Sequence, residues 1–338
     1  MKKKTIIISI IDAIVIIFLF IIYGPIPTFR NWFITTALAT GNHQYFANVL
    51  YSDNAIINTL KNNTIIESNT NTDASLIGKP EGSKENYDSI YEQQILERDE
   101  NALYKLIEIN EKDYSGYLVA IYDASKVELV TSKYINQGGQ KLTDFSESED
   151  ALVAINASGF SVDDKILTPT GTVIQDGKLL SVGSPNRHGG GLIGFNQDHV
   201  LILTTESAEQ AIKNGMVDAV EFGPFLIVNG IPSEVSGNGG WGYANRTAIG
   251  QRKDGIVLFL VIDGRGANGS NGISIADMIS LFEKYGAYNA ANLDGGGSST
   301  LTINNNLIND PRGYNYTGQR YLPNAWMLRK WYFERNWK

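Results

Sequence analysis

Three glycine-rich polar segments each follow an apolar stretch that has the character of a β-strand. They are residues 156–160 (NASGF), 263–266 (DGRG) and 294–299 (DGGGSS). Loops at strand ends are held by a rigid scaffold, and catalytic and binding groups are often found there. Asp263 and Asp294 therefore supply carboxylates at two strand ends, an arrangement that suits paired acid and base catalysis.

The segment 294–299 carries the strongest of these signals. Each glycine in regular structure costs about 0.5–1 kcal/mol relative to alanine, so three in a row at the edge of a core are wasteful in a plain linker. Glycines also leave main-chain N–H groups uncovered, and successive uncovered amides bind anions. We expect Asp294 to be catalytic. We expect substrate binding from Gly295, Gly296, Gly297, Ser298 and Ser299. Asp263 followed by glycine also fits an ordinary turn.

Further candidates lie outside the triple-glycine segment. Arg246 and Arg265 are suited to phosphate, because a guanidinium pairs bidentately with phosphate oxygens; a surface ion pair explains either arginine equally well. Glu221 follows an apolar stretch and is a candidate second catalytic carboxylate, or a turn residue. Asn156 is expected to bind substrate. His188 stands in a polar RHGGG segment and is a candidate to line the site, although a lone histidine is more often structural.

Composition narrows the chemistry. The 338-residue chain has a formal net charge of −8, no cysteine and three histidines. An acidic chain without a basic stripe disfavours nucleic acid as a partner. The absence of cysteine excludes disulfides, thiolate nucleophiles and cysteine-ligated zinc. The sequence also lacks the P-loop, the G-x-S-x-G elbow and the H-E-x-x-H zinc motif.

The N-terminus predicts a membrane anchor. Lys2, Lys3 and Lys4 precede an apolar run at 5–23 whose only charge is Asp12. A spanning helix needs ~20 apolar residues, and flanking lysines stay on the cytoplasmic side. We therefore expect 1–30 to be a cytoplasmic basic tip and a single-pass transmembrane helix, with the remainder extracytoplasmic in the cell membrane. The alternative is a cleaved signal peptide, for which Ala37-Leu38-Ala39 has the small-x-small pattern.

Three further regions follow the anchor. Residues 31–60 are expected to form a membrane-proximal helical segment, lying on the membrane or packed against the main domain. Residues 61–112 are polar at first and indicate a flexible spacer, followed by an entry helix. Residues 113–331 are the expected catalytic domain.

The main domain alternates short apolar runs with turns. Asp-Gly at 176–177 and at 254–255 lies between β-forming residues, which is a strong hairpin signal. We also expect 116–122 to pair with 126–131, and a helix from Ser274 to Gly286. The predicted fold class is α+β: a mixed, largely antiparallel β-sheet domain with packed helices, preceded by the transmembrane helix.

Taken together, the motifs resemble the phosphodiester glycosidase family. The blocks occur in the family's order: VAINASGF, PTGTVIQDG, FGPFLIVNG, NRTAIGQ, VIDGR, NLDGGGSSTL and RYLPNAW. The resemblance covers residues 115–330. The first loop departs from it, because the family usually has Asn-Gly-Gly-Phe where this chain has residues 156–160. The family includes a lysosomal enzyme that removes N-acetylglucosamine from a phosphodiester on mannose, and bacterial members labelled exopolysaccharide-related.

The resemblance implies hydrolysis of the bond between an anomeric carbon and a phosphodiester. Such a reaction passes through an oxocarbenium-like transition state. It implies Asp294 as the key carboxylate, with Asp263 or Glu221 as its partner and Arg246 or Arg265 beside the phosphate. A divalent cation such as Ca²⁺ is a candidate to lie between the carboxylates and the diester, and its ligands stay unknown. Two alternatives stay open: a glycosyl or phosphoglycosyl transferase of envelope assembly, and a non-catalytic polysaccharide-binding surface protein.

Overall fold

A computed structural model describes residues 2–38, 44–68, 70–79, 86–135, 137–164, 166–182, 189–313 and 315–330. The chain divides into two compact units. The first comprises Met1–Ile65, Val235–Tyr243 and Ser274–Ala276, and the second comprises Ile66–Glu234, Ala244–Ile273 and Asp277–Lys338. Each unit is described by itself.

The first unit contains four helices in its described part. They are α1 (Lys2–Tyr23), α2 (Pro27–Leu38), α3 (Gln44–Leu50) and α4 (Asp53–Lys61). Within α1, Ile6–Tyr23 has a mean hydropathy of 3.0 and is 6% buried. In the described residues it is the one helix long and apolar enough to cross a membrane, a test that a signal sequence also passes. Ile34, Tyr51 and Ile56 pack together between the shorter helices.

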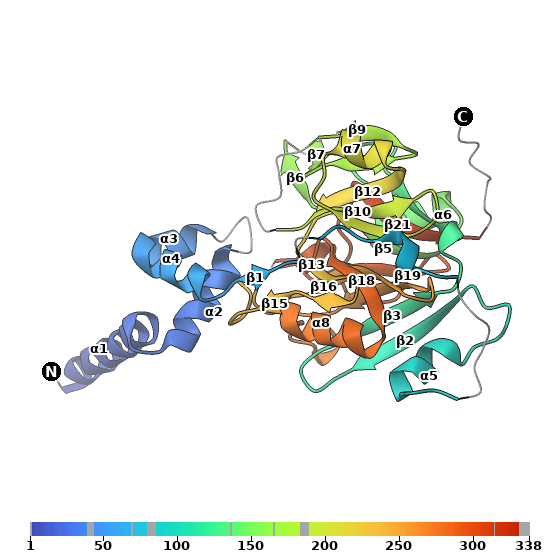
Figure 1. The fold of residues 1–338 in the computed structure, drawn as a ribbon. Coiled ribbons are helices and arrows are strands. Elements are labelled where there is room, and N and C mark those ends of the chain that lie inside the picture. The colour runs from blue at the N-terminus through green and yellow to red at the C-terminus, as the bar shows by residue number, and fades with distance from the viewer. Residues whose placement is uncertain are drawn as a thin grey trace. The chain divides into compact units, whose positions relative to one another are not determined.

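The second unit is built from three large sheets and one hairpin (Figure 1). The seven-stranded sheet has the order β14 (Ile231–Pro232), β13 (Phe225–Val228), β18 (Ala287–Asn292), β16 (Arg246–Arg252), β17 (Val257–Ile262), β3 (Ser115–Ile121) and β2 (Tyr104–Asn110). One five-stranded sheet has the order β11 (Leu201–Thr204), β10 (Gly191–Asn196), β12 (Met216–Phe222), β8 (Val173–Gln175) and β9 (Lys178–Ser181). The other has the order β20 (Asn306–Leu307), β19 (Leu301–Ile303), β5 (Ala151–Asn156), β21 (Asn324–Arg329) and β4 (Val127–Thr131).

The smaller elements complete the second unit. The hairpin pairs β6 (Phe160–Asp163) with β7 (Ile166–Pro169). The helices are α5 (Ile90–Leu96), α6 (Leu142–Ser148), α7 (Ala208–Lys213) and α8 (Ile275–Lys284). The short 3₁₀ turns are η1 (Ala74–Leu76), η2 (Ala124–Lys126), η3 (Ala267–Gly269) and η4 (Gly296–Ser298). The remaining short strands, β1 (Ile65–Ile66) and β15 (Glu234–Val235), each have one residue in either unit.

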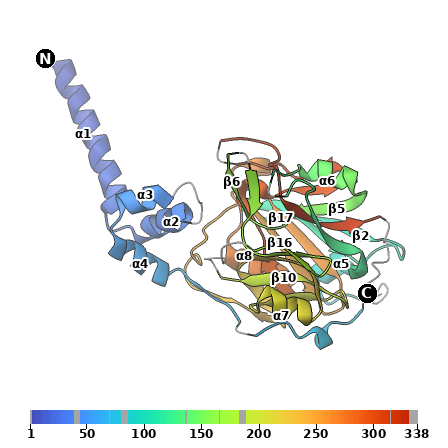
Figure 2. The ribbon, with the colours of Figure 1, turned by 90° about the horizontal axis from the view of Figure 1, so that it is seen from above.

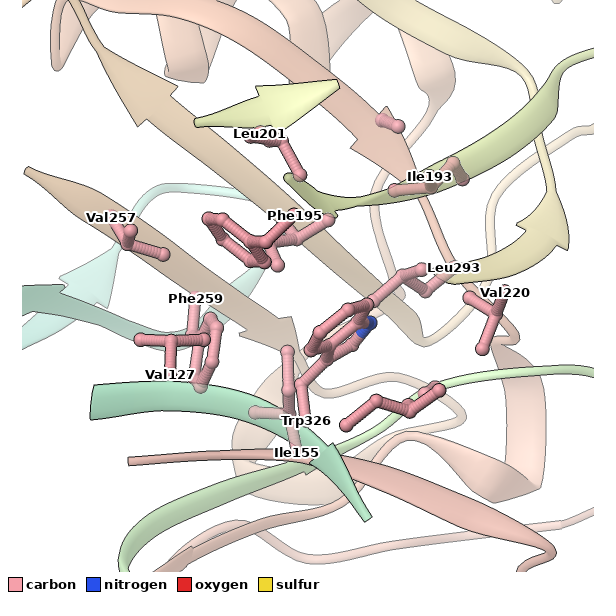
Figure 3. Close-up of a cluster of buried hydrophobic side chains, with 14 of the residues drawn as sticks. Val127, Ile155, Ile193, Phe195, Leu201, Val220, Val257, Phe259, Leu293 and Trp326 are labelled. Atoms are coloured by element: carbon pink, nitrogen blue, oxygen red, sulfur yellow. The ribbon is translucent and has the colours of Figure 1, made fainter. Parts of the chain in front are cut away.

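The inner faces of the three large sheets share one hydrophobic core (Figure 3). Alternate residues of β17, among them Val257 and Phe259, point into this core. Phe195 of β10 meets Trp326 of β21 edge to face, with ring centroids 5.5 Å apart. The contact joins the two five-stranded sheets directly.

Helices cover the outer faces of the large sheets (Figure 2). On the seven-stranded sheet, a Cβ at Gly250 would stand 2.8 Å from the ring of Phe282, so α8 packs closely on β16. Phe145 of α6 packs on the sheet of β5, and Ala211 of α7 packs on the sheet of β10. Because both faces are buried, β17 has an unbroken apolar sequence rather than an alternating one.

The predicted fold class, α+β with largely antiparallel sheets and packed helices, is confirmed. The hairpins through 176–177 and 254–255 are also as predicted. The predicted pairing of 116–122 with 126–131 is wrong. The short turn η2 carries the chain from one sheet to another, so β3 pairs with β2 and β17 while β4 pairs with β21.

Part of the predicted spacer and entry region, 61–112, belongs to the second unit. Glu67 accepts the Phe225 N–H at 2.7 Å, and the Gly78 N–H donates at 2.8 Å to a main-chain oxygen in the turn between β16 and β17. Residues 66–79, where described, are thus hydrogen-bonded to the sheets. The seven-stranded sheet begins with β2 inside the same predicted region. The bounds of the four predicted segments, 1–30, 31–60, 61–112 and 113–331, stay predictions.

Candidate active site

The ends of strands from two sheets meet at one place. In the seven-stranded sheet, the start of β16 lies beside the ends of β17 and β18, because both neighbours run antiparallel to it. In the sheet of β5, that strand ends where β19 and β21 begin. The loop after β18 joins the two groups: the Asp294 N–H donates to the Ala157 carbonyl at 3.2 Å. The predicted segments 156–160, 263–266 and 294–299 all start at this junction.

Asn156 is fully buried and holds the junction together. Its Nδ2 donates to the main-chain oxygen of Asp294 at 2.6 Å. Its Oδ1 accepts the Thr247 hydroxyl at 2.7 Å and the Thr300 N–H at 3.1 Å. These bonds make Asn156 a positioning residue for Asp294. A direct contact with substrate stays a prediction.

The carboxyl group of Asp294 is surrounded by donors and a cation. It accepts hydrogen bonds from the Ser298 hydroxyl and the Gly295 N–H, and the Arg320 guanidinium lies close enough to lower its pKa. Burial outweighs all three and raises the pKa of Asp294 to about 6. Ser298 also accepts a hydrogen bond from Nη1 of Arg320 at 3.1 Å. Asp294, Ser298 and Arg320 therefore form one connected group.

Each of the three glycines after Asp294 is required for a different steric or conformational reason. A Cβ at Gly295 would stand 2.8 Å from the Asn245 carbonyl. Gly296 has a φ of +60°, which favours glycine. A Cβ at Gly297 would stand 2.0 Å from the hydroxyl of Tyr316. The glycines thus allow close approach of neighbouring loops to the carboxylate.

The amides of this loop are largely engaged inside the protein. The Gly296 N–H donates to the Asn245 carbonyl at 2.8 Å. The N–H groups of Ser298 and Ser299 donate to carbonyls within the loop at 3.2 Å each, and the Gly295 N–H donates to Asp294. Ser298 and Ser299 are themselves buried. The loop presents its carboxylate more than a row of bare amides, and substrate binding by these residues stays a prediction.

Asp263 is only 1% exposed and connects two loops. Its Oδ2 accepts the Asn268 amide at 2.8 Å, and its Oδ1 accepts the Asn309 amide at 3.0 Å and the Asp310 N–H at 3.2 Å. Asn309 also donates to the Ser299 carbonyl at 3.0 Å, which links Asp263 to the triple-glycine loop. Burial raises the pKa of Asp263 against the lowering effect of these donors. These hydrogen bonds indicate that the Asp263 carboxylate holds the two loops together.

The two predicted arginines occupy different environments. Arg246 is 4% exposed, and its side-chain stem is among the nearest atoms to Gly295. Burial lowers the pKa of Arg246 to about 10, so its charge persists at neutral pH. Arg265 is exposed. Its charge acts on Tyr316: burial raises the pKa of this tyrosine, the charges of Arg320 and Arg265 lower it, and the charge of Asp294 raises it.

Glu221 and His188 complete the predicted set. Glu221 is half-buried near the end of β12, and its Oε2 accepts the Thr172 N–H at 2.9 Å. The loop that follows it is tied to the end of β18, because Asn292 donates to the Gly223 carbonyl at 2.8 Å. His188 lies outside the described residues.

A cavity of about 580 Å³ opens beside Arg320. Its volume falls in the range of small-molecule sites. The guanidinium of Arg320 stacks on the ring of Phe160, 4.2 Å from its centroid. The lining residues are Gly138, Gly139, Phe160, Val162, Leu167, Tyr316, Gln319, Arg320 and Tyr321.

Sequence reasoning missed Arg320 and Tyr316 as members of the site. Arg320 opens the RYLPNAW block, which suggested only a terminal strand. It is 26 positions beyond Asp294, and no spacing rule joins the two. Across the described ranges, no three or more His, Asp or Glu side chains gather to share a metal ion, so no ligand set emerges for the suggested Ca²⁺.

The sequence profile of the phosphodiester glycosidase family matches residues 149–329. A Bacillus subtilis (strain 168) protein, the SPbeta prophage-derived uncharacterized protein YomE, is 30% identical over 198 residues, covering 56% of this chain and 30% of that protein. The Bos taurus N-acetylglucosamine-1-phosphodiester alpha-N-acetylglucosaminidase is 28% identical over 156 residues, covering 40% of this chain and 29% of that enzyme. The matches therefore span less than a third of either relative.

Solved structures agree on the fold. The zebrafish N-acetylglucosamine-1-phosphodiester alpha-N-acetylglucosaminidase catalytic domain, auto-inhibited by its pro-peptide, superposes with a TM-score of 0.56 at 18% identity, covering 74% of this chain and 87% of that one. A putative exported protein from Burkholderia pseudomallei gives a TM-score of 0.50 at 17% identity, covering 64% and 74%. At such identities the likeness concerns the fold alone.

Proposed function

The chain belongs to the phosphodiester glycosidase family, and on that premise we propose that it is a membrane-anchored, extracytoplasmic glycosidase. It hydrolyses the bond between the anomeric carbon of a sugar and a phosphodiester oxygen in a cell-envelope or exopolysaccharide glycan. One observation carries the proposal: the Asp294 carboxyl, with a pKa raised to about 6, is linked through Ser298 to the Arg320 guanidinium. The pairing places a negative carboxylate beside a positive guanidinium. In the reaction, positive charge develops on the sugar ring and negative charge on the departing phosphate, and the two groups can stabilise one charge each.

In the proposed step, the C–O bond at the anomeric carbon breaks and its electron pair leaves with the phosphate. Water adds its oxygen to the anomeric carbon and releases a proton to solvent, so the products are a free sugar and a phosphomonoester. The departing phosphomonoester has a second pKa of ≈ 6, so it leaves readily without strong acid assistance. Ionised Asp294 stabilises the positive charge that develops on the sugar ring.

Arginines balance the negative charge on the departing group. Arg320 is suited to direct contact because it lines the cavity and stands next to Asp294 through Ser298. Buried Arg246, close to Gly295, adds a fixed positive charge beneath the loop. Exposed Arg265 is available to a larger substrate.

We assign the role of second carboxylate to Glu221 in preference to Asp263. The three donors on Asp263 and its 1% exposure leave it little access to a ligand. Glu221 is more open, and its following loop is bonded to β18 two residues before Asp294. Asp263 then acts as a positioning residue.

The apolar helix α1 supplies the proposed membrane anchor. Its 18-residue apolar stretch is just long enough to span with little tilt. The lysines at 2–4 favour a cytoplasmic N-terminus and therefore an extracytoplasmic second unit.

The test is release of free sugar from a panel of sugar 1-phosphodiesters by the full chain in phosphatidylcholine nanodiscs. Wild type should turn over at least one member, and Asp294→Asn should lower the rate at least ~100-fold. Near-normal turnover by Asp294→Asn would remove Asp294 from the mechanism. Product formed only after an acceptor alcohol is added would indicate a transferase, and binding without turnover would indicate a binding protein.

A further inference from the structure

The cavity beside Arg320 has an apolar floor formed by the hairpin β6–β7. Phe160 and Val162 are two positions apart on β6 and so point to the same face. Leu167 on β7 lies directly opposite Val162 in the register. All three side chains line the cavity, and Val162 is 58% exposed although it is apolar. An apolar surface kept open in this way suits an apolar ligand.

The cavity lining has few polar side chains, and one of them carries a charge. The neutral ones are Tyr316, Gln319 and Tyr321. Among its lining residues Arg320 is the only charged side chain, and Lys141 approaches from outside, 6.0 Å from the Tyr321 ring centroid. Gln319 is engaged elsewhere, because it accepts the Thr143 N–H at 3.1 Å and donates to the Thr143 hydroxyl at 3.2 Å. Every hydroxyl of a buried sugar ring needs a partner, and the guanidinium of Arg320 and the hydroxyls of Tyr316 and Tyr321 supply only a few.

Arg320 stands between the cavity and the catalytic carboxylate. On one side it donates to Ser298, which in turn donates to Asp294. On the other side it stacks on Phe160 of the cavity floor. A phosphate bound at this guanidinium therefore has a carboxylate on one side and an apolar cavity on the other.

We infer that the substrate is a glycosyl phosphodiester whose second ester group is an apolar alcohol, such as an alkyl or prenyl chain, and that this group occupies the cavity. The inference rests on the proposed function. The sugar lies toward Asp294, the phosphate at Arg320, and the chain over Phe160, Val162 and Leu167. Cleavage breaks the sugar–oxygen bond and releases the apolar alcohol as its phosphomonoester. The chain lies beyond the phosphorus, so its length changes binding and hardly alters the reactivity of the broken bond.

The test compares methyl, butyl and hexyl esters of N-acetylglucosamine 1-phosphate and of glucose 1-phosphate with the full chain in nanodiscs. Burial of each CH₂ group is worth up to about fourfold in affinity, so kcat/KM should rise at least ~10-fold from methyl to hexyl.

Val162→Asp should reduce this hexyl-to-methyl ratio to about twofold or less, because a carboxylate on the cavity floor opposes an apolar chain. Ile231→Asp is the matched control: Ile231 is also a β-branched strand residue, it is also 58% exposed, and it lies on β14 away from the cavity. It should keep the wild-type ratio.

A flat chain-length series in wild type, or a ratio unchanged by Val162→Asp, overturns the inference. If wild type hydrolyses none of the esters, the proposed function loses its support. Calorimetry with hexyl phosphate and methyl phosphate then tests separately whether the cavity binds an apolar chain. Hexyl phosphate should bind wild type at least ~10-fold more tightly than methyl phosphate, and Val162→Asp should remove the difference. Equal binding of the two phosphates, or displacement of hexyl phosphate by free N-acetylglucosamine, contradicts an apolar-chain site.

Discussion

The rate of sugar release should fall as the pH drops below about 6, because the proposed mechanism needs ionised Asp294. Burial is the main cause of its raised pKa of about 6, and the Arg320 charge opposes it. With that pKa, roughly nine-tenths of the carboxyl is ionised at pH 7 and roughly one-tenth at pH 5. The value of kcat/KM should therefore drop about tenfold between these pH values.

Arg320→Gln should move the midpoint of this acid limb to higher pH. An opposite charge at close range commonly lowers a carboxyl pKa by 1 unit or more, so its loss should raise the midpoint by about 1 unit. Arg320→Lys retains a positive charge and should leave the midpoint near that of wild type, even where the loss of guanidinium geometry lowers the rate. The readout separates the electrostatic action of Arg320 on Asp294 from any effect of Arg320 on substrate binding.

The assay is initial-rate kinetics of sugar release at subsaturating substrate from pH 4.5 to 8.5, at constant ionic strength, with each variant checked for folding across the range. The dependence of kcat/KM reports groups on the free enzyme. A wild-type rate that rises on acidification would mean that Asp294 acts in its protonated form. A midpoint in Arg320→Gln equal to or below that of wild type would refute the proposed coupling.

Two stability measurements test the roles assigned to the carboxylates. A buried acid whose folded pKa is raised costs stability above that pKa, and the cost fades as pH falls toward its unfolded value near 3.9. Asp294→Asn should therefore stabilise the fold at pH 8 by about 1–3 kcal/mol, and by less at pH 5, in thermal unfolding; destabilisation at pH 8 would point to a structural carboxylate. Asp263→Ala should instead destabilise the fold by at least ~2 kcal/mol, because it leaves the amides of Asn268 and Asn309 and the N–H of Asp310 without their acceptor. An unchanged melting temperature in Asp263→Ala would show that these bonds contribute little.

The candidate site was predictable in part because its segments have local signals. The triple glycine after Asp294 is visible in the sequence, and the structure gives each glycine a separate steric or conformational reason. The individual tasks of the polar residues were not predictable. Asn156 and Asp263 have the residue types of ligand-binding groups, yet their side chains are directed at neighbouring loops. Only the placement of those loops reveals this.

Arg320 is a site residue that the sequence did not predict. Its sequence neighbourhood resembles a terminal strand, and nothing local marks it as a partner of a carboxylate 26 positions earlier. The antiparallel β-bridge between Gln140 and Leu322 and the hairpin β6–β7 bring the arginine, the Phe160 ring and the cavity together. The proposed subsite for an apolar ester therefore has no counterpart in the sequence motifs.

What the sequence alone determined is what depends on near neighbours along the chain. The Asp-Gly hairpins, the apolar α1, the short apolar runs between turns and the α+β class all follow from local conformational preference and hydrophobic pattern. The tertiary structure decided which sheet each strand joins, as for β3 and β4 on either side of η2. It also decided the pKa of Asp294, because desolvation and the Arg320 charge arise from groups far apart in sequence. Burial and long-range electrostatics are properties of the packed molecule, and no short segment contains them.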